Sequence, residues 1–70
     1  QDFVLEIESV SNQVVVKTTT AAAQVIAESI DNLYIEGIVA SIAGDNVVLI
    51  ITPNENQAKD VANTIEKNIK

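Results

Sequence analysis

The chain has 70 residues, a formal net charge of −6 at pH 7 and no cysteine, histidine or methionine. This composition excludes a disulfide framework, argues against a zinc or haem site, and speaks against direct binding of nucleic acid or an anionic membrane. Hydrophobic residues make up 47% of the sequence and aromatic residues only 3%. We therefore expect residues 1–70 to form one small domain that buries part of its aliphatic surface against other copies.

The chain begins with two predicted strands. Phe3, Leu5 and Ile7 alternate with Val4 and two glutamates, a pattern that predicts a half-buried strand with these three apolar side chains on one face. A Ser-Asn turn at residues 11–12 separates this strand from a β-branched one around residues 14–16.

A helix is predicted next, over about residues 20–32. A threonine among residues 18–20 is expected to cap its N-terminus, because threonine hydroxyls accept from free backbone N–H groups there. The helical spacing is carried by Ala22, Val25, Ile26, Ile30 and Leu33.

Two further strands, over residues 38–43 and 47–51, flank a Gly-Asp-Asn turn. Glycine tolerates a positive φ, so Gly44 is expected to let this turn close an antiparallel hairpin. Pro53 ends the second strand because it cannot donate to a β-ladder. Asn54 then predicts the N-cap of a second helix, whose apolar stripe is Ala58, Val61, Ala62, Ile65 and Ile69.

The order β-β-α-β-β-α predicts an α+β fold of two layers, with two helices on one face of a four-stranded, mostly antiparallel sheet. The strand at residues 47–51 is apolar at every position. Its second face must therefore be covered from outside the domain.

Catalysis has few candidates in this sequence, since histidine and cysteine are absent and no nucleophile–base pair occurs at informative spacing. We predict that the chain is not an enzyme. Asp45, at the tip of the hairpin, leaves two interpretations open. It serves turn chemistry, or it is a rigid carboxylate that receives a guanidinium or an ammonium group.

Three segments of the chain resemble, in order, the C-terminal domain of the bacterial arginine repressor. They are Val14–Thr18 with Ala22–Gln24, then Ile30–Leu33, then Gly37–Asn46. The most specific motif is the family's Gly-Thr-Ile-Ala-Gly-Asp-Asp signature, which corresponds here to residues 40–46. The likeness extends from about Phe3 to Ile69.

The resemblance implies a function in transcription regulation of arginine metabolism. In that family the domain forms trimers, and two trimers stack into a hexamer with L-arginine bound between them as effector. A separate N-terminal winged helix-turn-helix domain binds operator DNA, so the present chain would be the effector-binding and oligomerisation half of a cytoplasmic regulator, and would contact neither DNA nor membrane itself.

The resemblance also implies a ligand site without metal or cofactor. The matching positions are Gln24, Asp31, Ser41, Ala43, Asp45 and Asn46. Asn46 departs from the family, which has a second aspartate there. A neutral amide replaces one charge-assisted contact, so we expect arginine to bind about tenfold more weakly.

Three alternatives remain. The chain is an oligomerisation domain that has lost or weakened arginine sensing, a small α/β enzyme of the dehydratase-like type, or an amino-acid-binding module attached to a metabolic enzyme. The second would need a strong base, which the composition does not supply.

Overall fold

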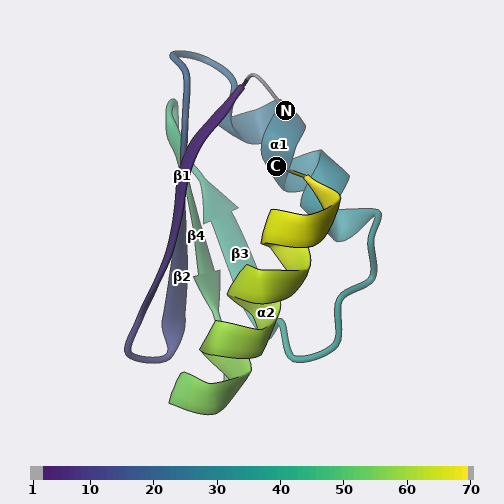
Figure 1. The fold of residues 1–70 in the computed structure, drawn as a ribbon. Coiled ribbons are helices and arrows are strands. Elements are labelled where there is room, and N and C mark those ends of the chain that lie inside the picture. The colour runs from purple at the N-terminus through teal and green to yellow at the C-terminus, as the bar shows by residue number, and fades with distance from the viewer. Residues whose placement is uncertain (1–2, 70) are drawn as a thin grey trace.

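The computed structural model describes residues 3–69 as a two-layer α+β fold (Figure 1). The elements are β1 (Val4–Val10), β2 (Gln13–Thr18), α1 (Ala23–Asp31), β3 (Ala40–Ala43), β4 (Val47–Ile51) and α2 (Glu55–Asn68). Both helices lie on the same side of the sheet. The predicted order and fold class are confirmed.

The sheet has four strands in the order β1-β2-β4-β3, and all neighbouring pairs are antiparallel. The two central strands supply the floor of the core, because Val14 lies opposite Ile50 and Val16 opposite Val48. All four side chains are fully buried under the helices. Helix α1 packs on β2, β3 and β4, whereas α2 packs on β1 and β2.

The first strand departs from the predicted alternation. A β-bulge inserts Leu5 as an extra residue, since Val4 lies opposite Thr18 and Glu6 opposite Lys17. The bulge changes which face each side chain takes. Val4 is buried, whereas Phe3 and Leu5 are 52% and 59% exposed, so the prediction of one shared apolar face for Phe3, Leu5 and Ile7 is wrong.

Helix α1 begins later than predicted and lacks the expected threonine cap. Its N-cap residue is Ala22, which makes no side-chain hydrogen bond to the helix. The Ala23 N–H group is instead bonded to the backbone carbonyl of Asp45, at 3.2 Å. The core side of the helix is formed by Ala23, Ile26 and Ile30, while Val25, predicted in the apolar stripe, is 59% exposed.

The β3–β4 hairpin has the predicted three-residue turn, closed by a 2.8 Å hydrogen bond from the Gly44 N–H to the Val47 carbonyl. The expected role of Gly44 is wrong. The described glycine with a positive φ is Gly37, at +102°. Strand β3 also begins two residues later than predicted, at Ala40, with Ile38 packed against the core.

The start of α2 is as predicted. The Asn54 side chain accepts a 2.8 Å hydrogen bond from the Gln57 backbone N–H. Such a cap satisfies one of the free donors at a helix N-terminus. The predicted stripe is also confirmed: Ala58, Val61 and Ile65 are fully buried, with Ile69 buried at the end.

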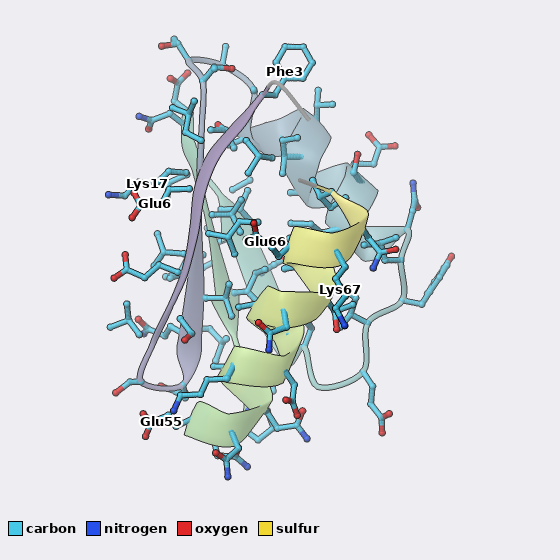
Figure 2. The ribbon with its side chains drawn as sticks, viewed as in Figure 1. Phe3, Glu6, Lys17, Glu55, Glu66 and Lys67 are labelled. Atoms are coloured by element: carbon cyan, nitrogen blue, oxygen red, sulfur yellow. The ribbon has the colours of Figure 1, made fainter. Side chains whose placement is uncertain are left out.

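The face of the sheet away from the helices is uncovered in the chain alone, as expected. We call it the open sheet face. The Glu6 and Lys17 side chains lie at its rim on this side (Figure 2), with the Lys17 Nζ 3.6 Å from a Glu6 carboxylate oxygen. Its apolar residues, from the strand pairings, are Val10, Val15, Ala40, Ile42, Val47, Leu49 and Ile51.

Candidate ligand-binding site

The turn at residues 44–46 is fastened to the start of α1 and to the end of β2. The Asp45 carbonyl accepts from the Ala23 N–H at 3.2 Å, and the Asn46 carbonyl accepts from the Thr18 N–H at 2.8 Å. These bonds satisfy backbone groups that the helix and the strand would otherwise leave unpaired. The turn therefore presents the side chains of residues 45 and 46 from a fixed backbone.

The Asp45 side chain is exposed, and one of its oxygens is already engaged. Its Oδ2 accepts a 3.3 Å hydrogen bond from the backbone N–H of Ala21. Ala21 has a left-handed backbone, with φ of 67°. The second carboxylate oxygen, Oδ1, is available to a cationic group.

Gln24, in the first turn of α1, is held beside the same turn. Its Nε2 donates to the Ala43 carbonyl at 3.2 Å. Because the amide nitrogen makes this bond, the amide oxygen is left to accept from a ligand. Asp45 and Gln24 together offer acceptors, which suits a ligand rich in N–H donors.

Four of the six predicted site residues, Gln24, Ala43, Asp45 and Asn46, gather at this corner of the molecule. Asp31 is exposed at the other end of α1, seven residues from Gln24 and about 10 Å along the helix axis. A separation of seven residues returns to the same side of a helix. Asp31 therefore lies on the same exposed side of α1 as Gln24 and does not join the Asp45 cluster.

Ser41 lies on β3 opposite Ile50, two residues before Ala43. This register places Ser41 on the face of the sheet that the helices cover, where it is half-buried. No side-chain hydrogen bond links Ser41 to the turn within residues 3–69.

Sequence reasoning missed the contribution of the loop between β2 and α1. This loop supplies the Ala21 N–H to Asp45 and lines an adjoining hollow of about 190 Å³ with exposed Phe3, labelled in Figure 2. The run of threonines and alanines at residues 18–23 carries no sequence signal for this contribution, because the same run predicts an ordinary helix cap. The hollow is lined by Phe3, Thr19, Thr20, Ala21, Ala22 and Val25.

The site is an open surface in a single chain, because Gln24, Asp45 and Asn46 are all exposed. Over residues 3–69 no group of three or more acidic, histidine or cysteine side chains could hold a metal ion. In the same part of the chain, no helix has the length and apolar character needed to cross a membrane.

Comparison with known proteins identifies the family. The model of the family described as "Arginine repressor, C-terminal domain" matches residues 1–67. An arginine repressor of Clostridium novyi is 44% identical over 64 residues, which is 91% of this chain and 42% of that protein. An arginine repressor of Clostridium acetobutylicum is 42% identical over 66 residues, 94% of this chain and 44% of that protein.

A more distant relative, an arginine repressor of Acidobacterium capsulatum, is 39% identical over 65 residues, 93% of this chain and 44% of its own length. The chain thus spans less than half the length of the curated relatives it matches. The family is one of transcription regulators, not of enzymes. The chain belongs to the family of arginine repressor C-terminal domains.

Proposed function

We propose that this chain is the effector-binding and oligomerisation domain of an arginine-responsive transcription regulator of arginine metabolism. It binds L-arginine at the interface between two stacked trimers, through Gln24, Asp31, Ser41, Ala43, Asp45 and Asn46. Operator DNA is bound in the cytoplasm by a separate N-terminal domain.

The observation that carries this proposal is the pair of free acceptors beside the 44–46 turn. Asp45 keeps one carboxylate oxygen unengaged, and the Gln24 amide oxygen is turned away from its bond to Ala43. A guanidinium or an α-ammonium carries only donors. A carboxylate on a fixed backbone is a strong receptor for such a group, because bonds to ionised partners are roughly twice as strong as neutral ones.

The length of the site also suits a ligand that is charged at both ends. Gln24 and Asp31 lie on one side of α1, about 10 Å apart along its axis. A carboxylate at each end of this stretch, Asp45 beside Gln24 and then Asp31, gives separate receptors for an α-ammonium and a guanidinium.

Two features support binding between copies rather than within one chain. The site is an exposed surface and does not enclose a ligand by itself, whereas ligand sites generally bury most of the ligand. The open sheet face leaves a continuous apolar row of Val15, Leu49 and Ile42 across three strands, which is the kind of surface that oligomers bury.

The regulatory mechanism would be linkage. A ligand that contacts two trimers at once stabilises their stacked state to the extent that it binds that state more tightly than the separate trimers. Stacking then brings more DNA-binding domains into one particle, which raises the apparent affinity for paired operator sites without any new DNA contact.

The test is to titrate L-arginine by calorimetry and to follow the assembly by sedimentation, using wild type, Asp45→Asn and the matched control Asp60→Asn. Asp60 is an exposed aspartate on α2, the other helix. We expect heat of binding and a shift towards hexamer for wild type and for Asp60→Asn. Asp45→Asn should bind at least tenfold more weakly. Absence of heat and of any shift in the wild type would reject arginine sensing.

Asn46 favours a second candidate function. With an amide where the family has an acid, the chain could assemble without responding to arginine. This candidate predicts the same oligomer at every arginine concentration. The sedimentation experiment separates the two, because only the sensing domain changes its assembly when arginine is added.

A further inference from the structure

Strand β1 is an edge of the sheet, and the strand pairing identifies which of its backbone groups point outward. The Thr18 N–H donates to the Asn46 carbonyl at 2.8 Å, so the even-numbered residues of β2 direct their backbone groups towards β4. The odd-numbered residues of β2 therefore bond to β1, and their partners there are Glu6, Glu8 and Val10. The residues in between, Ile7 and Ser9, direct their N–H and C=O groups away from the sheet.

The side chains of Ile7 and Ser9 line a groove of about 390 Å³ between β1 and α2. Its other wall consists of residues spaced three or four apart on one side of the helix, namely Lys59, Ala62, Asn63 and Glu66. Ile7 and Ala62 pack against the core and give the groove an apolar floor. The two strand residues with outward backbone groups thus also border a space that can receive side chains.

The edge formed by β1 is poorly protected against pairing. Edges of sheets are commonly blocked by a proline, a lysine, a bulge or a very short strand. β1 has seven residues, contains neither proline nor lysine, and its bulge at Leu5 leaves the stretch from Glu6 to Val10 regular. The opposite edge, β3, has only four residues. The longer edge is therefore the one that suits the addition of a strand.

The face of β1 away from the groove is acidic. Glu6 and Glu8 lie on this face, because their partners Lys17 and Val15 belong to the open sheet face and its rim. A Glu6 carboxylate oxygen is 3.6 Å from the Lys17 Nζ, whereas Glu8 makes no ion pair within residues 3–69. This charge distinguishes between the possible occupants of the edge.

A second copy of β1 fits this edge poorly. If two copies paired antiparallel about Ile7, Glu6 of each copy would lie opposite Glu8 of the other. If they paired about Glu8, the two Glu8 side chains would lie opposite each other. Like charges directly opposite each other destabilise a strand pair, whereas opposite charges stabilise it. The edge therefore favours a strand that carries basic side chains at these positions.

We propose that the β1 edge binds an extended segment of a partner protein as an additional antiparallel strand. The segment alternates basic residues, which face Glu6 and Glu8, with small apolar residues, which enter the groove. Backbone bonds to Ile7 and Ser9 supply affinity, and the alternate side chains supply specificity. Since β1 and β3 are opposite edges of the sheet, this surface is separate from the 44–46 turn and does not depend on arginine binding.

The test titrates the isotope-labelled 70-residue chain with the capped peptide Lys-Val-Lys-Val-Lys and follows amide shifts and hydrogen exchange by NMR. In the chain alone, the amides of Ile7 and Ser9 should exchange fast and those of Glu6 and Glu8 slowly, because only the latter bond to β2. The peptide should slow exchange at Ile7 and Ser9. Methylating both valine nitrogens removes the donors opposite these residues and should weaken binding at least about tenfold.

Two matched pairs of variants locate the binding surface. Ser9→Pro removes an N–H that β2 does not use, a position where an edge strand tolerates proline, whereas Ser9→Ala keeps this donor. Only Ser9→Pro should weaken peptide binding, by about fivefold or more. Glu8→Lys should weaken it by about three- to tenfold, because it sets like charges opposite each other. Glu28→Lys, the same charge change at an exposed position on α1, should weaken it by about twofold or less.

Equal binding of the methylated peptide would overturn this inference because it rules out strand addition, and equal binding of Glu-Val-Glu-Val-Glu would do so because it rules out charge recognition. Slow exchange of the Ile7 and Ser9 amides without peptide, increasing with protein concentration, would show that a second copy occupies the edge and would equally overturn it. The comparison of peptides does not depend on the folding of any variant.

Discussion

Ala21 holds a backbone conformation that costs an alanine free energy. Its φ of 67° lies in the left-handed region, where the Cβ crowds the backbone. The conformation directs the Ala21 N–H to the Asp45 carboxylate, and the Ala22 N–H to the Thr19 carbonyl. Ser11 and Tyr34 also have a positive φ, but of these three residues Ala21 is the one in the loop that positions the candidate site.

The first prediction concerns this residue. Ala21→Gly should leave the free energy of unfolding unchanged or raise it by up to about 1 kcal/mol, because glycine adopts a positive φ without the Cβ clash. The matched control is Ala27→Gly in the middle of α1, which should lower the free energy of unfolding by about 1 kcal/mol. Urea unfolding at one fixed protein concentration measures both. Equal losses at the two positions would contradict the role assigned to Ala21.

Asp45 shows why the site could be predicted only in part. The acid in a short turn between apolar strands pointed to a rigid carboxylate, and the backbone bonds of residues 45 and 46 bear out the rigidity. The bond from Ala21 could not be predicted, because it joins residues 24 positions apart and depends on an alanine with positive φ. Nothing in a Thr-Ala run signals that conformation.

At the scale of elements, the periodic patterns predicted which helices and strands form, but not the irregularities within them. Helix α2 matches its prediction because Asn54, the apolar stripe and Pro53 all indicate the same boundary. Strand β1 does not, because the bulge at Leu5 breaks the period of two. A one-residue slip exchanges the faces of a strand, and only the pairing with β2 determines where the slip occurs.

The start of α1 was mispredicted for a related reason. Threonines 18–20 suggested a local cap, but the first N–H of the helix is satisfied from the β3–β4 turn instead. A hydrogen bond to a distant turn therefore takes the place of the cap that a neighbouring threonine was expected to supply. As a consequence, the helix that carries Gln24 and Asp31 is tied directly to the turn that carries Asp45.

The second prediction tests the Asn54 cap of α2, which the sequence predicted. Asn54→Ala should lower the free energy of unfolding by about 1 kcal/mol, because the Gln57 N–H loses its acceptor at the exposed start of α2. Asn56→Ala, two residues further on and exposed without a capping role, is the control and should change stability by less than about 0.5 kcal/mol. An equal effect of the two variants would show that the cap contributes nothing measurable.

At the scale of the whole molecule, the two surfaces of the proposed assembly belong to different parts of the fold. The open sheet face is the side of the sheet without helices, whereas Gln24 and Asp31 lie on the exposed side of α1 in the other layer. Two separate surfaces allow an assembly in two stages. In the first stage, copies join through the open sheet face to form a small oligomer; in the second, such oligomers join around a ligand. Substitutions on one surface should therefore affect one stage first.

The last prediction follows from this separation. Ile42→Lys places a charge on the open sheet face opposite Leu49, at a position 66% exposed in the single chain. The isolated fold should tolerate this change, but burying the ammonium against another copy carries a desolvation cost. We expect Ile42→Lys to sediment as a smaller species, with little or none of the oligomer that forms through the open sheet face. Wild type and the control Asn56→Lys, which places a lysine on α2 in the helix layer, should remain assembled at the same concentrations. If the oligomer persists in Ile42→Lys, the open sheet face is not the surface that holds the copies together, and the aliphatic excess of the chain needs another partner.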